Sequence, residues 1–317
     1  MKILVVGGAG YIGSHMVLAL QEAGCHPVVL DNLSTGHRDA VRNSELIVGD
    51  QSDQALLERI FTTYTFSAVM HFASYIDVAE SVLLPAKYYQ NNVTNTFLFL
   101  EMMLKHRVQN FIFSSSAAVY GDVQQTPLNE SHPRLPINPY GHSKKMVEDR
   151  LYDLAQSTGL RYAVLRYFNA TSCDSLGRLR ERHDPESHLI PLILQVAKGM
   201  RPYAAIYGDD YETVDGTCVR DYVHVIDLCE AHWLALQALQ DGCDPIICNV
   251  GRGEGVSVKQ VLASARRVTQ HSIPVQLASR RAGDPAILVA DIAYAKQRLG
   301  WRPRYLEIDQ MIRHMWY

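Results

Sequence analysis

The chain opens with MKILVVGGAGYIG, residues 1–13, a stretch that predicts a strand, a glycine-rich turn and the start of a helix. Residues 1–6 form a short apolar run that is typical of a buried strand. Gly7, Gly10 and Gly13 follow at the spacing of a dinucleotide-binding turn. We expect one glycine to permit the tight turn, one to let backbone approach a phosphate, and one to let the helix pack closely on the strand.

The segment after the glycines contains the other parts that dinucleotide binding requires. A helix over residues 14–23 would point its free N–H groups and the positive end of its dipole at a pyrophosphate. A second strand over 27–31 ends at Asp31, where a carboxylate can accept hydrogen bonds from ribose hydroxyls. Asp31 favours NAD over NADP, because a 2′-phosphate would face its charge. Arg38 lies near enough to keep NADP as the alternative.

Strand and helix patterns alternate through the first half of the chain. Further strands are expected at 45–49, 67–72, 110–115 and 161–167, with helices ending near 63, over 93–106 and over 140–157. This alternation predicts an α/β fold, a Rossmann-type doubly wound parallel sheet with helices on both faces. We expect a NAD-binding domain over 1–168, with a returning strand near 244–250, and a smaller mixed α/β substrate domain over 169–317.

Composition excludes several classes of function for this chain of 317 residues. A net charge of −3 provides no basic footprint for nucleic acid or an anionic membrane. The six cysteines form no CxxC pair, so neither a zinc site nor a disulfide framework is predicted, and no metal is expected. No apolar run reaches the roughly 18 residues of a membrane span, and no charged-then-apolar leader precedes the first strand. We therefore expect a cytoplasmic protein with no nucleic-acid or membrane partner.

A second informative stretch is PYGHSK at residues 139–144. Tyr140 and Lys144 are four positions apart and therefore lie on one helix face. Ser116 belongs to SSSAAVYG (114–121), which begins where a predicted strand ends. Hydroxyls at the carboxyl end of a parallel strand lie at the edge where ligands bind. We interpret Ser116, Tyr140 and Lys144 as one catalytic group.

The chemistry expected of this group is proton transfer by a tyrosine. A phenol with a pKa near 10 is ionised to only about one part in a thousand at pH 7. Bringing the pKa of Tyr140 to about 7 requires roughly 4 kcal/mol of preferential stabilisation of the phenolate. Lys144 and a positively charged nicotinamide ring are two cations that can supply it. Ser116 would hydrogen-bond the same substrate oxygen and relay its proton.

Further segments occur in one order over essentially the whole chain. They are GGAGYIGSH (7–15), HFA (71–73), NNV (91–93), LRYFN (165–169), DGTCVRDYVHV (215–225) and RAGD (281–284). Together with SSSAAVYG and PYGHSKKMVE, they resemble the extended short-chain dehydrogenase/reductase superfamily and, more narrowly, the UDP-glucose 4-epimerase family. The resemblance implies a UDP-sugar substrate and an NAD that stays bound and is regenerated at every turnover.

The resemblance also implies roles for individual residues. Tyr140 as phenolate takes the proton of the sugar 4′-hydroxyl while C4′ gives a hydride to the nicotinamide, and the 4-keto sugar then turns over and takes the hydride back on its other face. The implied catalytic residues are Ser116, Tyr140 and Lys144. The implied cofactor contacts are Gly7, Gly10, Tyr11, Ile12, Asp31, Asn32, Asp50, Gln51, Phe72, Ala73, Asn91, Ser114, Tyr140, Lys144 and Tyr167. The implied substrate contacts are Ser116, Tyr140, Asn169, His188, Leu189, Ala205, Tyr207, Arg220, Arg281 and Asp284.

Some of these residues have alternative interpretations. Arg220 and Arg281 suit a diphosphate, because a guanidinium can hold phosphate oxygens through two hydrogen bonds. Asp50 lies at the end of a predicted strand, where it can contact a ligand or cap the next helix. Residues 171–187 contain three arginines, and we interpret them as a mobile loop with solvated charge.

The chain departs from the family pattern at a few positions. Ile76 stands where many members carry a lysine near the NAD diphosphate, and Ser74 replaces a frequent glycine or alanine. His188 stands where one branch has asparagine. Leu288 occupies the position that gates the 2-substituent of the sugar. A large tyrosine there goes with plain hexoses and small residues go with N-acetylated ones, so leucine leaves both open.

Several rival functions follow from the same residues. The most serious is C4 epimerisation of another UDP-sugar: UDP-N-acetylglucosamine, UDP-xylose or UDP-arabinose, or UDP-glucuronate. A dehydratase would need an acid and a base where Ala117 and Ala118 stand, and alanine transfers no proton. A net oxidoreductase would use the same residues with exchangeable NAD. A non-catalytic NAD-binding protein is disfavoured because Ser116, Tyr140 and Lys144 are all present.

Two helices near 91–106 and 140–157 predict a homodimer. The first is apolar on nearly every face, and a helix that is apolar all round is buried all round. The second carries four apolar residues: Met146, Val147, Leu151 and Leu154. We expect both helices to pack against those of a second subunit.

Overall fold

A computed structural model describes residues 1–123, 125–281 and 284–317. Its main sheet contains seven parallel strands in the order β10-β6-β5-β4-β1-β2-β3. The strands are β1 (Lys2–Val6), β2 (His26–Asp31), β3 (Glu45–Val48), β4 (Ala68–His71), β5 (Asn110–Ser116), β6 (Arg161–Tyr167) and β10 (Ile246–Val250). The strand order reverses between β1 and β4, which is where ligands of doubly wound sheets bind.

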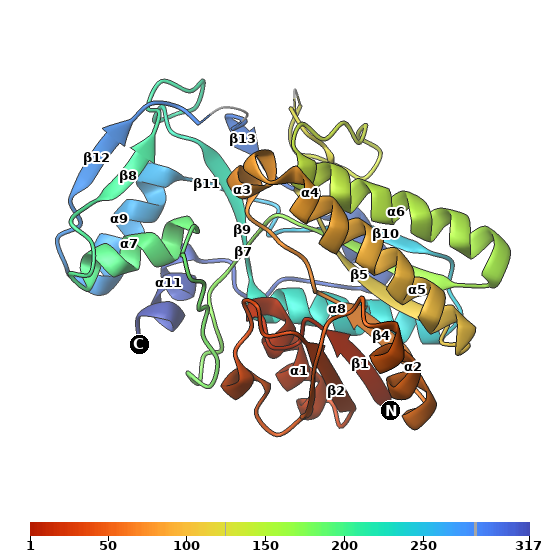
Figure 1. Ribbon diagram of the computed structural model, residues 1–317. Helices are drawn as coiled ribbons and strands as arrows, with labels where there is room; N and C mark the ends of the chain where they lie inside the picture. Colours follow the sequence, from red (N-terminus) through yellow and green to blue (C-terminus); the bar gives the residue numbers. More distant parts are fainter. Residues whose placement is uncertain (124, 282–283) are drawn as a thin grey trace.

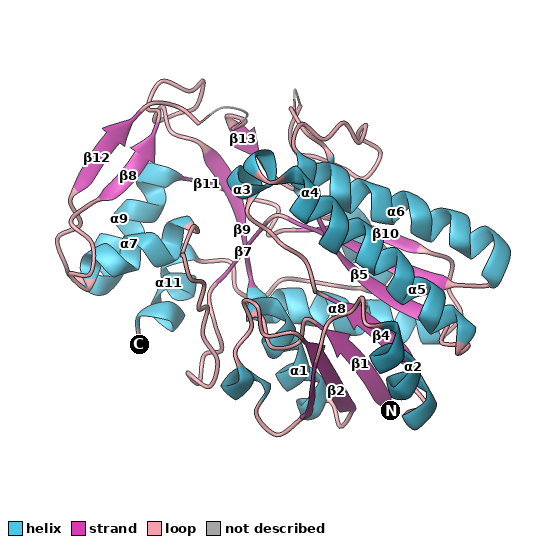
Figure 2. Cartoon of the chain, viewed as in Figure 1, coloured by secondary structure: helices cyan, strands magenta, loops and turns pink. Residues whose placement is uncertain are grey.

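Helices cover both faces of this sheet (Figures 1 and 2). One face carries α1 (Tyr11–Glu22) and α8 (Val225–Gln240), and the other carries α2 (Gln54–Thr63), α5 (Thr96–Lys105) and α6 (Pro139–Thr158). Side chains of β1 alternate between the two cores, with Ile3 on the α1 side and Leu4 on the α5 side. Burial on both faces explains the continuous apolar run that begins the chain. The predicted α/β fold class is confirmed.

The second half of the chain builds a smaller mixed assembly. Its strands are β7 (Asn169–Thr171), β9 (Val219–His224), β11 (Gly255–Ser257) and β13 (Ile287–Leu288) in one sheet, and β8 (Ala204–Tyr207) with β12 (Val275–Ala278) in another. Its helices are α7 (Leu189–Ala197), α9 (Val258–Thr269) and α11 (Ile308–Trp316), which share one apolar core. The remaining helical elements are η1 (Arg38–Val41), α3 (Val78–Leu83), α4 (Pro85–Tyr88), η2 (Tyr89–Asn95), η3 (Ala117–Val119) and α10 (Ala293–Leu299). None of the helices within the described ranges combines the length and apolar character that a bilayer crossing requires.

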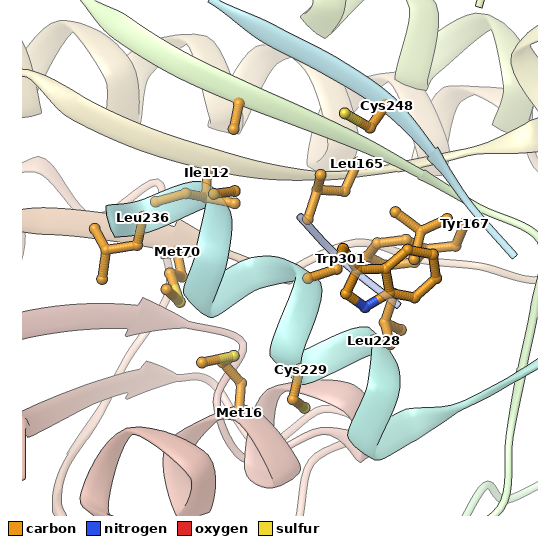
Figure 3. Close-up of a cluster of buried hydrophobic side chains, with 14 of the residues drawn as sticks. Met16, Met70, Ile112, Leu165, Tyr167, Leu228, Cys229, Leu236, Cys248 and Trp301 are labelled. Carbon is orange, nitrogen blue, oxygen red and sulfur yellow. The ribbon is translucent and has the colours of Figure 1, made fainter. Parts of the chain in front are cut away.

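Segments from the second half complete the core of the main sheet (Figure 3). Leu228 and Cys229 of α8 lie in the same buried cluster as Met16 of α1 and Ile112 of β5. Trp301 is fully buried there, and its indole Nε1 donates to the backbone carbonyl of Asp227 at 2.8 Å. The division at residues 168 and 169 stays a prediction, and α8 and β10 pack on the sheet of the first segment.

The helix expected over 93–106 consists of two elements. The π-helix η2 precedes α5, and π-helical turns occur often at functional sites. Within η2, Asn92 accepts from the Tyr75 N–H at 2.9 Å and donates to the Tyr75 carbonyl at 3.0 Å. Asn92 also donates to the Ser143 hydroxyl at 3.2 Å, so this turn ties the segment after β4 to α6.

The expectation for the apolar side chains of α6 is wrong in part, whereas the mobility of the loop over 171–187 stays a prediction. Three of the α6 residues expected at a subunit interface (Val147, Leu151 and Leu154) lie in the chain's own core, because α6 uses that face to cover the sheet. The loop over 171–187 is anchored by its arginines: Arg178 pairs with Asp174 and Glu22 at 2.7 Å each, and Arg182 pairs with Asp39 at 2.9 Å.

A buried ion pair joins α6 to β6. Nε and Nη2 of Arg166 donate to Oε1 and Oε2 of Glu148 at 3.0 and 2.7 Å. The two side chains are only 3% and 1% exposed. Ser115 donates to Glu148 at 2.6 Å, and Tyr120 accepts from Arg166 at 2.8 Å. Two parallel N–H···O bonds fix the pair's geometry, and therefore the position of α6 against β5 and β6.

Replacing Glu148 by glutamine should lower the free energy of unfolding by about 3 kcal/mol, because the buried Arg166 loses its counter-charge. Urea denaturation followed by circular dichroism measures the loss. Glu101→Gln is the matched control, since Glu101 is a 58% exposed partner of Arg150. The control should cost less than about 1 kcal/mol. Equal losses in the two variants would contradict the importance of the buried pair.

Candidate active site

The three glycines of the first turn differ in what surrounds them. Gly7 has φ +79°, and a Cβ there would lie 2.5 Å from the Ala73 backbone nitrogen. A Cβ on Gly13 would lie 2.2 Å from the Gly7 carbonyl oxygen. Gly10 is different, because its nearest neighbour, the same oxygen, would be 3.4 Å away. The packing of the chain therefore requires glycine at 7 and 13, whereas glycine at 10 leaves the turn open to a ligand.

The start of α1 and the end of β2 form a polar cradle beside this turn. Gly10 is the N-cap of α1 and offers no side chain, so N–H groups of the first helical turn are left for a ligand. Asp31 accepts from the Ala9 N–H at 2.9 Å and from the Leu33 N–H at 2.8 Å, one bond on each oxygen. Each carboxylate oxygen keeps a lone pair for a ribose hydroxyl. Burial raises the pKa of Asp31, and these two backbone hydrogen bonds oppose the increase.

Asp50 lies beside this cradle and does not cap the next helix. It accepts from Asn32 Nδ2 at 2.7 Å and from the backbone and hydroxyl of Ser52 at 2.9 and 2.7 Å. The cap of α2 is Asp53, which accepts from the Leu56 N–H at 3.0 Å. The interpretation of Asp50 as a helix cap is therefore wrong, because α2 begins three residues later than the end of the strand suggests.

The cofactor candidates around β4 form a buried network. Gln51 donates to the Asn91 carbonyl at 3.1 Å and lies 2.6 Å from His71 Nε2. Burial lowers the pKa of His71 to about 3, and the charge of Lys144 acts in the same direction. The side chain of Gln51 is thus committed to protein groups. Phe72 packs against the ring of His232, with centroids 5.0 Å apart.

The three consecutive serines at the end of β5 point alternately to the two faces of the sheet. Ser115 faces the buried Glu148, away from the candidate site. The Ser114 hydroxyl lowers the pKa of Tyr167, whose hydroxyl contacts His232. The Ser116 hydroxyl lowers the pKa of Tyr140, and it accepts from the Ala118 N–H at 3.2 Å. Two of the three hydroxyls therefore serve the site.

Close packing at the start of α6 sets the distance between Ser116 and Tyr140. Asn138 caps α6 by accepting from the Gly141 N–H at 2.8 Å, and Pro139 occupies the first helical turn. A Cβ on Gly141 would lie 2.4 Å from the Ala118 carbonyl oxygen. Glycine at 141 therefore lets the helix start approach the turn that follows Ser116.

Lys144 is buried at the centre of the candidate site. Its Nζ donates to the Ser74 hydroxyl at 2.8 Å and to the Ser114 carbonyl at 2.7 Å. An ammonium has three N–H donors, so one remains for a ligand. Burial lowers the pKa of Lys144 to about 7, although the charge of Glu148 raises it. Sequence reasoning noted Ser74 only as a departure from the family, and its contact with Lys144 was missed.

Taken together, the chain's own groups raise the pKa of Tyr140. Burial raises it, and the hydrogen bond from Ser116 opposes that increase. Nζ of Lys144 lies 5.8 Å from the centre of the Tyr140 ring and donates to two uncharged acceptors. Desolvation of the phenolate dominates in the chain alone, so the expectation that Lys144 and a nicotinamide ring lower the pKa of Tyr140 stays a prediction.

Four of the substrate residues expected in the second half of the chain lie in two contacting pairs, and the others lie apart. Arg220 lies 3.3 Å from Asp284 and donates to the Pro285 carbonyl at 2.8 Å. The guanidinium of Arg281 lies 3.9 Å from the centre of the Tyr207 ring. Five other residues are half-buried: Ile12 at the start of α1, Asn169 in β7, Leu189 at the start of α7, Ala205 in β8 and Leu288 in β13.

His188 lies against two carboxylates at the end of the loop that follows β7. Its Nδ1 is 3.0 Å from both Glu181 and Glu186. Burial lowers the pKa of His188, but the two neighbouring carboxylates outweigh burial and raise it to about 10. Tyr11, another expected cofactor contact, donates to the Ser172 carbonyl at 2.5 Å in the same loop.

Comparisons with known proteins agree on one family. A model described as the NAD dependent epimerase/dehydratase family matches residues 3–251. The chain is 49% identical to a UDP-glucose 4-epimerase of Halalkalibacterium halodurans, over all of this chain and 95% of that protein.

Solved structures are similar over the same length. The UDP-glucose 4-epimerase of Brucella ovis in complex with NAD has a TM-score of 0.97 at 48% identity, covering 99% of this chain and 97% of that one. The enzyme of Bifidobacterium longum in complex with NAD+ and UDP has a TM-score of 0.93 at 36% identity, covering 100% and 97%. The chain belongs to the NAD dependent epimerase/dehydratase family and, within it, to the UDP-glucose 4-epimerases.

Proposed function

We propose that the protein is an NAD-dependent epimerase that inverts C4 of a UDP-hexose, UDP-glucose or UDP-galactose, through a transient 4-keto sugar. The observation that carries this proposal is the group formed by the buried Tyr140 and Lys144 and the half-buried Ser116 at the carboxyl edge of the sheet. Ala117 and Ala118 follow directly in η3. Neither can transfer a proton, which argues against a dehydratase.

The residues around the first turn fit a dinucleotide. The open side of Gly10 and the start of α1 would hold the pyrophosphate, and Asp31 would accept from the adenosine ribose. Asn32 and Asp50 would line the adenine end, and Phe72, Ala73, Asn91, Ser114 and Tyr167 the nicotinamide end. The side chain of Gln51 would support the cofactor site through its bonds to Asn91 and His71. Ile76 is 45% exposed, so the diphosphate would rely on backbone donors in place of a lysine. When bound, NAD supplies a reversible hydride acceptor and a positively charged ring.

Tyr140 would act as the base that removes the proton of the 4′-hydroxyl. The Ser116 hydroxyl acts on the phenol by lowering its pKa, and it would share the same sugar oxygen. Lys144 keeps one N–H donor, and its lowered pKa lets it give up a proton near pH 7. These three residues would hold the proton while the keto sugar turns over in the site.

Residues of the second half would bind the nucleotide-sugar. Arg220 and Arg281 would hold the diphosphate, and Asp284 and Tyr207 fix the directions of the two guanidinium groups. The rest of the nucleotide-sugar site would be lined by Asn169, Leu189 and Ala205. His188 has its Nε2 edge left for a polar contact. Leu288 is the register partner of Arg220 in β9 and is half-buried. Its intermediate size keeps UDP-N-acetylhexosamines and UDP-pentoses as alternative substrates.

Proton NMR of the purified protein with UDP-galactose, and no added cofactor, should show conversion at C4. Tyr140→Phe should retain its NAD but convert the sugar about 10²–10⁴-fold more slowly, because the general base is lost. UDP-N-acetylgalactosamine and UDP-arabinose, tested in parallel, identify the preferred sugar. Turnover that needs stoichiometric added NAD and accumulates NADH would indicate a dehydrogenase. Wild-type turnover by Tyr140→Phe would contradict the assignment of the base.

Replacing Gly10 by alanine should reduce NAD binding without unfolding the chain. The new methyl group would occupy the open side of the turn, and losing one phosphate contact costs about tenfold in affinity. NAD released by denaturing the purified protein measures the effect, and the melting temperature of the cofactor-free protein should change by at most about 2 °C. Gly13→Ala is the control that destabilises the fold, since its Cβ would lie 2.2 Å from a backbone oxygen. Unchanged NAD content in Gly10→Ala would contradict this phosphate site.

We also propose a homodimer, but with fewer interface residues than the sequence predicts. Phe97 and Leu98 of α5 are half-buried, and Met146 of α6 is 43% exposed. Arg150 of α6 lies over the Phe97 ring at 5.6 Å, so the two outer helix faces are continuous. Sedimentation should give twice the chain mass of 35.6 kDa. Met146→Glu should weaken the dimer. Leu176→Glu, at a 74% exposed position in the loop over 171–187, should leave the dimer unchanged. A monomeric wild type would contradict the proposal.

A cytoplasmic location is also proposed, and the state of the cysteines supports it. All six are free thiols, and five of them are buried. Free thiols persist in reducing compartments.

A further inference from the structure

Two histidines and two glutamates meet at the end of the loop between β7 and α7. Glu181, His183, Glu186 and His188 each offer one ligand atom, and these atoms all lie within 4.8 Å of one another. We propose that the four side chains form a structural site for one divalent transition cation, with Zn²⁺ as the best fit. None of them belongs to the group that transfers the proton.

The spacing of the donor atoms fits a single tetrahedral ion. Glu181 Oε1 lies 3.0 Å from His188 Nδ1 and 3.2 Å from His183 Nδ1. Glu186 lies 3.0 Å from His188 Nδ1 through Oε1 and 3.8 Å from His183 Nδ1 through Oε2. Metal–ligand bonds of about 2.0–2.1 Å place neighbouring donors of a tetrahedron about 3.3–3.4 Å apart. Two imidazoles and two carboxylates are a donor set that Zn²⁺ accepts.

Glu181 provides a second, independent indication of a cation. Its side chain is only 1% exposed, and neither of its oxygens has a hydrogen-bond partner. Nδ1 of His183 is also buried without one. The contacts of Glu181 are short, but they are not directed as hydrogen bonds. A buried carboxylate without directed donors is costly, and a shared cation removes that cost.

The other carboxylate is oriented by the backbone. Glu186 Oε1 accepts the N–H groups of Ser187 and His188 at 2.8 Å each. Such outer contacts fix a carboxylate in the direction that a metal ligand needs. Glu186 therefore presents its oxygens to both histidines from a fixed position.

The location of the cluster indicates what a bound ion would do. His188 is the N-cap residue of α7, and the His183 ring meets the Tyr11 ring edge-on at 5.9 Å between centroids. Tyr11 is the first residue of α1, beside the glycine turn. Four protein ligands close the coordination sphere, as in structural zinc sites. The ion would fasten the end of the loop to α7 and against the start of α1.

The test uses the full-length protein, stripped with EDTA and then titrated with Zn²⁺. After gel filtration, elemental analysis should find one zinc per chain. Hydrogen exchange over 172–188 should slow. The melting temperature should rise by roughly 5 °C at a zinc concentration about 100-fold above Kd. Glu181→Gln and His183→Gln should each lose the bound zinc and both responses. His106→Gln is the matched control, because His106 pairs with a single glutamate, Glu58, at 3.3 Å, and it should behave as wild type.

Two results would overturn the proposal: a wild type that binds no zinc at a small molar excess, or variants at 181 and 183 that still bind one zinc per chain. Co²⁺ provides a measurement that depends on no variant. The intense visible absorption of tetrahedral Co²⁺ in the wild type supports the site, and the weak spectrum of octahedral Co²⁺ contradicts it. All of these readouts are independent of epimerase activity.

Discussion

The burial of one ammonium group constrains the whole catalytic side of the molecule. Lys144 lies under the carboxyl edge of the sheet with 2% exposure, and its charge is costly there unless its donors are used. The chain provides two acceptors, the Ser74 hydroxyl after β4 and the Ser114 carbonyl in β5. This requirement ties α6 to two neighbouring strands at the same edge. Burial also lowers the pKa of Lys144 to about 7, which is the range in which a proton-transfer group is most useful.

Tyr140 depends on a contribution that the chain lacks by itself. Burial alone would keep the phenol protonated, and Lys144 is engaged with uncharged partners. When bound, the positively charged nicotinamide would then be the main source of phenolate stabilisation. The cofactor that supplies the hydride acceptor would therefore also help Tyr140 to act as the base, and proton and hydride transfer would be coupled electrostatically.

The main features of the fold could be predicted from the sequence because local pattern and tertiary structure agree there. Strand β6 and helix α6 were expected almost to the residue, since an apolar run marks the strand and the Tyr140/Lys144 spacing marks the helix face. The errors arose where the outcome depends on the exact end of an element or on a partner in another element. Whether Asp50 caps α2 depends on where α2 begins, and the inward face of α6 depends on the sheet it covers. The contact of Ser74 with Lys144 spans seventy residues. The His and Glu cluster was missed because only cysteine pairs were considered as metal ligands, although the pattern Glu-x-His-x-x-Glu-x-His lies within one short segment.

The return of α8 and β10 to the main sheet affects how the chain can fold as it is synthesised. The face of the sheet that carries Ile112 is covered by α1, with Met16, and by α8, and β6 remains an open edge until β10 pairs with it. At about 5–20 residues per second, a ribosome needs roughly 4–16 s to proceed from residue 168 to residue 250. During that interval the first half of the chain presents an apolar face and an unpaired strand. Such surfaces are the ones that chaperones bind and that drive aggregation, so the period before α8 emerges is the vulnerable stage in the biogenesis of this protein.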